Sequence, residues 1–127
     1  MRILLLSFTA ALLMGCAAPL YLAKGTHDGV EVAYRWSHPA NKPSELLLRL
    51  KNTTENDKQI ELVIDVAYQG RTVESLSADT CIKAGQELNG KLNGIYFIPT
   101  RVTTQQIKDG GVDLDLTRTT VAPCERP

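Results

Sequence analysis

Apolar and polar residues alternate with a period of two along much of this chain. The clearest case is the segment 59–69, in which Ile60, Leu62, Ile64 and Val66 share one face and leave the other mostly polar. This period is typical of a β-strand with one face in the core and the other in water. The same pattern predicts strands at 30–36, 45–51, 72–78 and 112–117. Two short segments complete the set: 80–83, which carries Cys81, and the compact apolar run 95–98.

Polar and turn-forming residues separate these segments. Residues 52–58 contain no apolar side chain, so we predict a hairpin loop there. The pairs Asn89-Gly90 and Asn93-Gly94 predict tight turns, because both residue types accept positive φ angles.

The strand at 72–78 is the weakest of the set. Val73 and Leu76 fall out of phase in it, which predicts a bulge or a sheet edge. About seven short strands, with a single helical turn predicted at 103–108, indicate an all-β protein. We expect an antiparallel β-sandwich, with a closed barrel as the alternative all-β arrangement.

The first residues have the composition of an export signal. Arg2 precedes an apolar run from Ile3 to Met14, which is too short to span a bilayer. The run ends in Leu13-Met14-Gly15-Cys16, which resembles the lipobox of bacterial lipoproteins. The alternative is an ordinary signal peptide cleaved near Ala17-Ala18, with Cys16 discarded.

The lipobox resemblance implies a location and a domain plan. Residues 1–15 would be a lipoprotein signal peptide, and Cys16 would become the first mature residue and carry fatty acyl chains such as palmitate. Residues 16–28 would form a lipidated tether, and residues 29–127 the folded domain. The acyl chains on Cys16 would thus anchor the protein in a membrane of a bacterial cell envelope. By the same resemblance, Ala17 favours the outer membrane over the inner one as the site of the anchor.

A second resemblance concerns the folded part. The stretch Leu46–Gly85 looks like the small Ig-like and fibronectin-III-like modules of bacterial envelope lipoproteins. The segments 80–85 and 90–97 are similar to uncharacterised secreted domains of Bacteroidetes-type bacteria. These resemblances imply an Ig-like sandwich, and they carry no information about an activity. The order of landmarks differs from that of antibody domains, because Trp36 precedes both later cysteines.

The charge balance bears on possible partners, and the cysteine content bears on a disulfide. The chain has 14 basic and 14 acidic residues, a balance that gives no electrostatic reason to expect nucleic acid as a partner. With Cys16 assigned to lipid, Cys81 and Cys124 remain as a pair, and an oxidising compartment favours a disulfide between them. Two free buried thiols are the alternative.

The chain has few residues that could bind a metal ion. His27 and His38 are the only histidines, and with the cysteines assigned they supply too few ligands for a metal site. Asp109, Asp113 and Asp115 form an acidic group that we interpret as solvated surface rather than a calcium site. We therefore expect no cofactor and no metal.

No catalytic constellation accompanies these residues. Ser37-His38, like Ser75 and Ser77, lacks a nucleophile elbow and an orienting acid, so we expect no enzyme. Among the aromatic residues, Tyr21 is expected outside the fold. Tyr34, Trp36, Tyr68, Tyr96 and Phe97 are expected mainly in the core.

These observations favour a lipid-anchored envelope module that binds another envelope protein or a glycan, or serves a structural role. The segment 72–78 is the predicted edge for strand addition. The alternative is an inhibitor of a hydrolase of lysozyme or protease type, which would use the loop 52–58.

Overall fold

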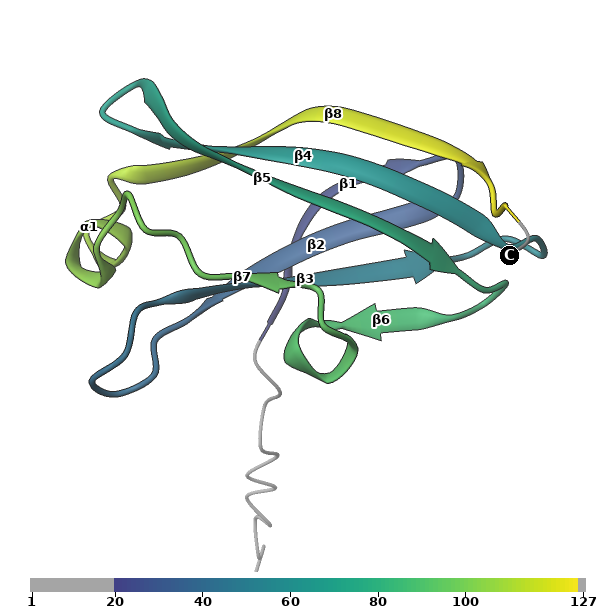
Figure 1. Cartoon of the computed structure of the whole chain (residues 1–127), viewed down its shortest axis with the longest axis horizontal. Helices are drawn as coiled ribbons and strands as arrows, with labels where there is room; N and C mark the ends of the chain where they lie inside the picture. The colour runs from purple at the N-terminus through teal and green to yellow at the C-terminus, as the bar shows by residue number, and fades with distance from the viewer. Residues whose placement is uncertain (1–19, 126–127) are drawn as a thin grey trace, which may run out of the picture.

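A computed structural model describes residues 20–125, whose strands form two facing antiparallel sheets (Figure 1). The five-stranded sheet contains β1 (Leu22–His27), β2 (Val30–Ser37), β3 (Glu45–Asn52), β6 (Glu87–Asn89) and β7 (Tyr96–Phe97). The three-stranded sheet contains β4 (Lys58–Tyr68), β5 (Arg71–Ile82) and β8 (Val112–Pro123), with β4 in the middle. A 3-10 helix, η1 (Gly90–Asn93), and the α-helix α1 (Thr104–Lys108) interrupt the strands. The predicted β-sandwich and the predicted helical turn are confirmed.

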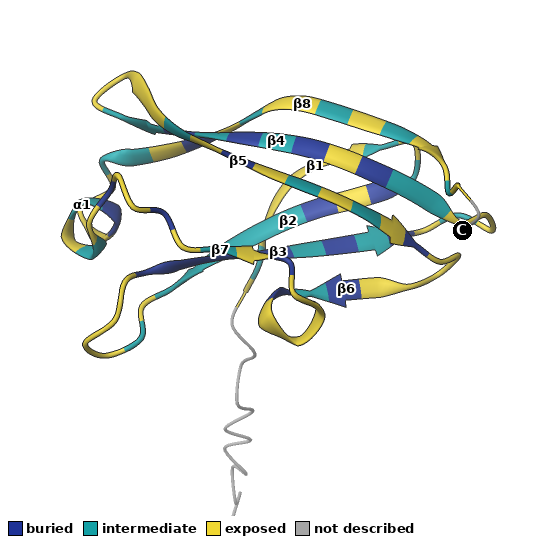
Figure 2. Ribbon diagram, in the orientation of Figure 1, coloured by how far each residue is buried: buried dark blue, intermediate teal, exposed yellow. Residues whose placement is uncertain are grey.

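The core lies between the two sheets and is built by the apolar faces of the alternating strands. Buried residues recur at every second position of β4 (Figure 2). The largest fully buried apolar side chains are Leu46, Leu48, Leu50, Ile60, Leu62 and Ile82. Leu47 points to the opposite face of β3 and is nevertheless buried, because Gly90 and the chain around Tyr21 cover it.

Two hairpins turn through two residues with positive φ. The β1–β2 turn uses Asp28 at 45° and Gly29 at 80°, and the β4–β5 turn uses Gln69 at 53° and Gly70 at 77°. Pairs of left-handed residues match the right-handed twist of the flanking strands, which is why they close tight hairpins.

The strand predicted at 72–78 and the segment 80–83 belong to one strand, β5. Val66 pairs with Glu74 and Ala67 pairs with Thr72, so Val73 is the extra residue of a bulge. The bulge explains the change of phase, and β5 lies at a sheet edge, so both expectations are confirmed.

The expected tether is corrected over residues 22–27. These residues form β1, which pairs with β2 from Leu22↔Tyr34 to His27↔Val30 with an irregularity at Lys24. Five of its six residues are exposed, so backbone pairing rather than an apolar face holds the strand. The signal peptide 1–15 and the Cys16 end of the tether lie outside the described residues.

The aromatic residues divide largely as expected. The side chains packed partly buried against the core are Tyr34, Trp36, Tyr68 and Phe97. Tyr96 differs from the expectation of a core position, because it is 37% exposed. Tyr21, expected outside, is half-buried instead, because its ring lies against Arg35, with 5.4 Å from Cζ to the ring centroid.

Candidate functional site

One end of the sandwich gathers a polar loop, a turn and the disulfide. The loop 53–57 joins β3 to β4, and the turn 83–86 joins β5 to β6. The disulfide between Cys81 and Cys124 lies beside the loop, and together they line an open hollow of about 570 Å³. We call this end the disulfide pole; it lies where Figure 1 marks the C-terminus.

Asn52 holds the loop from beneath. Its side chain is fully buried at the end of β3. The amide nitrogen donates to the carbonyl oxygens of Ile82 at 2.9 Å and Asn56 at 2.8 Å. The amide oxygen accepts from the backbone nitrogen of Thr54 at 3.0 Å and from its hydroxyl at 2.7 Å. Two donors and two acceptor positions are all that an asparagine offers, so its hydrogen-bonding capacity is satisfied.

Further bonds hold the loop at both sides. The backbone nitrogen and the hydroxyl of Thr53 donate to the Gly29 carbonyl at 2.9 and 2.6 Å, which ties the loop to the β1–β2 turn. The Asp57 carboxylate accepts from the backbone nitrogen of Ala84 at 2.9 Å, which ties it to the turn 83–86. The conformation of the loop is therefore set by three separate parts of the fold.

The predicted disulfide is confirmed, and its position is specific. Cys81 lies near the end of β5, and Cys124 follows the end of β8, with 5.8 Å between their Cα atoms. Gln59 of β4 pairs with Cys81 on one side and with Ala122 on the other. The bridge therefore joins the two edge strands of one sheet around the start of β4, rather than joining the two sheets.

The exposed side chains of the loop are suited to recognition. Glu55, Asn56 and Asp57 are exposed and offer carboxylate and amide groups on a loop whose backbone is held in place. A loop that is already ordered loses little conformational entropy when it binds, so more of its contact energy remains as affinity. Sandwich folds commonly bind through loops at their ends.

A serine–histidine contact exists, but with a different serine from the one considered in the sequence. His38 Nδ1 lies 2.7 Å from Ser44 Oγ, which lies 2.5 Å from Thr104 Oγ1. Burial lowers the pKa of His38, and the nearby Lys108 ammonium lowers it further. Ser44 is only 4% exposed, and within residues 20–125 no carboxylate hydrogen-bonds to His38. The contact joins the β2–β3 loop to α1 and does not present a nucleophile to solvent.

The acidic residues considered for calcium are not brought together. Asp113 and Asp115 lie exposed on β8, whereas Asp109 ends α1 and accepts from Gln105. Among the described residues, no group of three or more His, Cys, Asp or Glu is arranged to hold a metal ion. Nor does any helix of residues 20–125 have the length and apolarity needed to cross a bilayer.

Asn52 is the residue that sequence reasoning missed. It lies in the segment predicted to be a loop, and its sequence, Asn-Thr-Thr with Asn56 nearby, is typical of a solvated turn. Its burial depends on Ile82, which is distant in sequence.

Comparison of the chain with known protein families, with characterised proteins and with solved structures finds no match. The function is therefore argued from the sequence and the geometry alone.

Proposed function

We propose that this chain is a lipid-anchored protein of a bacterial cell envelope that binds another envelope protein or a glycan through the disulfide pole, without catalysing a reaction. The observation that carries the binding role is the fully bonded Asn52, which fixes an exposed polar loop. Rigid loops on a stable scaffold are a common means of specific recognition.

Two features support the location. The lipobox ends at Cys16, four residues before the first described residue, Leu20. The disulfide between Cys81 and Cys124 suits an oxidising compartment outside the cytoplasm. Ala17 favours the outer membrane as the site of the anchor.

The loop is a better binding element than the edge strand β5. The bulge at Val73 limits the regular edge of β5 to Glu74–Ile82, and natural proteins use bulges at sheet edges to discourage edge-to-edge pairing. The loop, by contrast, is held in one conformation.

The anchor is tested by the mass of the mature N-terminal peptide from the membrane fraction of producing bacteria. The proposal expects a peptide that begins at Cys16 and carries acyl chains, and expects Cys16→Ala to leave the membrane fraction. An unmodified peptide that begins beyond Cys16 would contradict it.

Inhibition of a lysozyme- or protease-type hydrolase is the second candidate function, because a rigid loop also suits insertion into an active site. The exported Cys16→Ala protein would be titrated against lysozymes and proteases. Stoichiometric inhibition that Glu55→Ala weakens would favour the inhibitor. Absence of inhibition, together with a lipid on Cys16, would favour the binding module.

A further inference from the structure

The described chain begins on the outer face of the five-stranded sheet, beside η1. Tyr21 is held there by its contact with Arg35, and a Cβ atom at Gly90 would lie 3.3 Å from the Tyr21 hydroxyl oxygen. Gly90 is the first residue of η1. Figure 1 shows η1 and the start of the described chain on the same side of the molecule. The described part of the chain therefore begins at a defined place on the sandwich.

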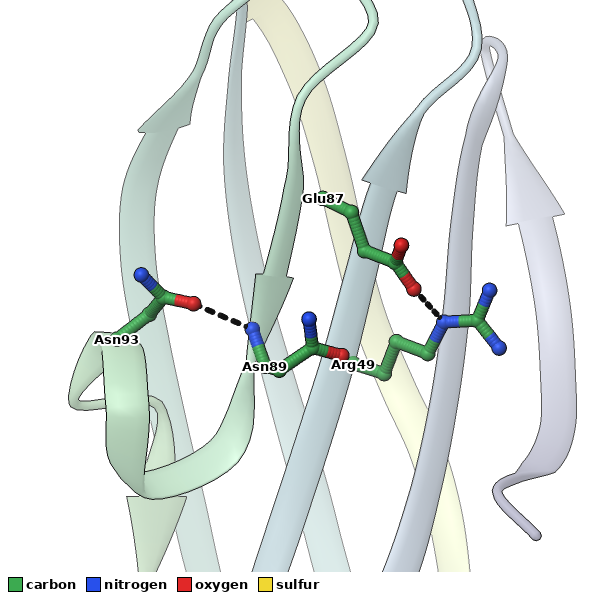
Figure 3. A network of polar contacts seen from close by, with 4 residues as sticks. All are labelled: Arg49, Glu87, Asn89 and Asn93. Atoms are coloured by element: carbon green, nitrogen blue, oxygen red, sulfur yellow. Dashed lines mark hydrogen bonds and ion pairs between the residues drawn. The ribbon is translucent and has the colours of Figure 1, made fainter. Parts of the chain in front are cut away.

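Two leucines project at this place. Leu92 in η1 and Leu20 are each 86% exposed, the highest values among the large apolar side chains of the described residues. The η1 turn that carries Leu92 is closed by the Asn93 side-chain oxygen, which accepts from the Asn89 backbone nitrogen at 2.7 Å (Figure 3). Apolar side chains that project into water at one place on a protein often mark a contact with a partner or a membrane.

Basic and aromatic groups lie beside Leu92. A hollow of about 430 Å³ lies between Tyr21, Arg35, Lys91 and neighbouring residues. The Lys91 ammonium lies 2.7 Å from the buried Glu45 carboxylate and forms an ion pair with it, although the two groups are not aligned for a hydrogen bond. The same ammonium lies 5.6 Å from the centroid of the Tyr96 ring. Leucine, tyrosine and long basic side chains together are typical of protein surfaces at the boundary between lipid and water.

The length of the preceding chain places this surface near lipid. Cys16 lies five residues before Tyr21, so a fully extended chain separates their Cα atoms by at most about 18 Å. Acyl chains on Cys16 would lie in the hydrocarbon, below a headgroup layer roughly 5–8 Å thick. The leucines beside Tyr21 therefore cannot move far from the headgroups.

We propose that the N-terminal surface, defined by Leu20, Tyr21, Arg35, Lys91 and Leu92, rests on the bilayer with both leucines among the lipid headgroups. The occupant of this surface is the membrane that holds the acyl chains, and the contact fixes the orientation of the sandwich. This inference rests on the proposed lipidation of Cys16.

The test uses the full-length lipidated protein in vesicles of phosphatidylethanolamine and phosphatidylglycerol. Leu92→Cys provides the only reactive thiol, because Cys81 and Cys124 are bonded and Cys16 is acylated. It is labelled with a polarity-sensitive nitrobenzoxadiazole, and quenching by nitroxide-bearing lipids is measured. The control is Thr120→Cys, an exposed position on β8 in the other sheet. Both positions are exposed, so neither change removes core packing.

We expect several-fold stronger quenching at position 92 than at position 120, with a blue-shifted emission at position 92 alone. Equal quenching in protein that floats with the vesicles would overturn the orientation and leave the lipid anchor standing. Protein that does not float with the vesicles would overturn the anchor, and this inference with it.

Discussion

The side-chain amide of Asn52 at the end of β3 donates a hydrogen bond to the carbonyl of Ile82 at the end of β5, with 2.9 Å between the two atoms. The strands β3 and β5 belong to different sheets. A single buried amide therefore joins the two layers at the disulfide pole, and the same side chain orders the loop 53–57.

Removal of this amide should loosen the pole. Asn52→Ala leaves the backbone carbonyl of buried Ile82 without this donor and removes the bonds that hold the part-buried loop at Thr54 and Asn56, so we expect a loss of about 1–3 kcal/mol in the free energy of unfolding. Denaturation with urea measures it. Asn56→Ala is the matched control, because Asn56 is exposed and contributes its backbone to these bonds, and it should change stability little. Equal effects of the two variants would argue against the role given to Asn52.

Gly29 should tolerate a methyl group less well than Gly70. Both have positive φ, but a Cβ at Gly29 would lie 2.3 Å from the Thr54 Cγ2 atom, whereas a Cβ at Gly70 meets nothing within 4 Å. Gly70→Ala should therefore cost only backbone strain, roughly 1–2 kcal/mol, and Gly29→Ala should cost more. Adding Thr54→Ser, which removes Cγ2, should restore part of the difference. If the two single variants unfold at the same denaturant concentration, the loop does not pack against the β1–β2 turn.

The disulfide should stabilise the fold without being needed for the shape of the loop. It closes a sequence separation of 43 residues, so the paired change Cys81→Ser and Cys124→Ser should lower the free energy of unfolding by about 3–4 kcal/mol. Hydrogen exchange should still protect the Asn52 contacts, since neither cysteine takes part in them. Loss of that protection together with the bridge would show that the disulfide, and not Asn52, orders the loop.

His38 should titrate below its ordinary pKa near 6.5. Burial is the larger cause and the Lys108 charge the smaller one, so Lys108→Gln should raise the pKa part of the way back. Because the folded state favours the neutral imidazole, its contribution to stability is present above the ordinary pKa and is lost as pH falls through the lowered one. NMR titration of the ring protons measures both proteins. An unchanged midpoint in Lys108→Gln would exclude the charge effect.

Local pattern predicted the strands whose stability comes from burial. The segment 59–69 alternates because one face of β4 lies in the core, and that cause is visible in the sequence. The strand β1 was not predicted, because its residues are mostly exposed and its pairing with β2 depends on the backbone. A single extra residue, Val73, shifted the phase of β5 near its start.

The candidate site was harder to predict from the sequence, because it also depends on contacts between distant residues. A buried polar residue is recognisable only when its partners are known, and those of Asn52 include Ile82 in the other sheet. The pairing of Cys81 with Cys124 was predictable, because cysteine parity and the predicted export signal constrain it without any knowledge of contacts.

In-cell photocrosslinking tests whether the disulfide pole binds a partner in the envelope. A photoreactive residue would replace Glu55 in the loop of the full-length protein, with Thr120 on β8 as the control position. We expect a reproducible crosslinked product with an envelope protein from position 55, absent from position 120 and weakened by Asn52→Ala. The same products from both positions, or none from position 55, would contradict it.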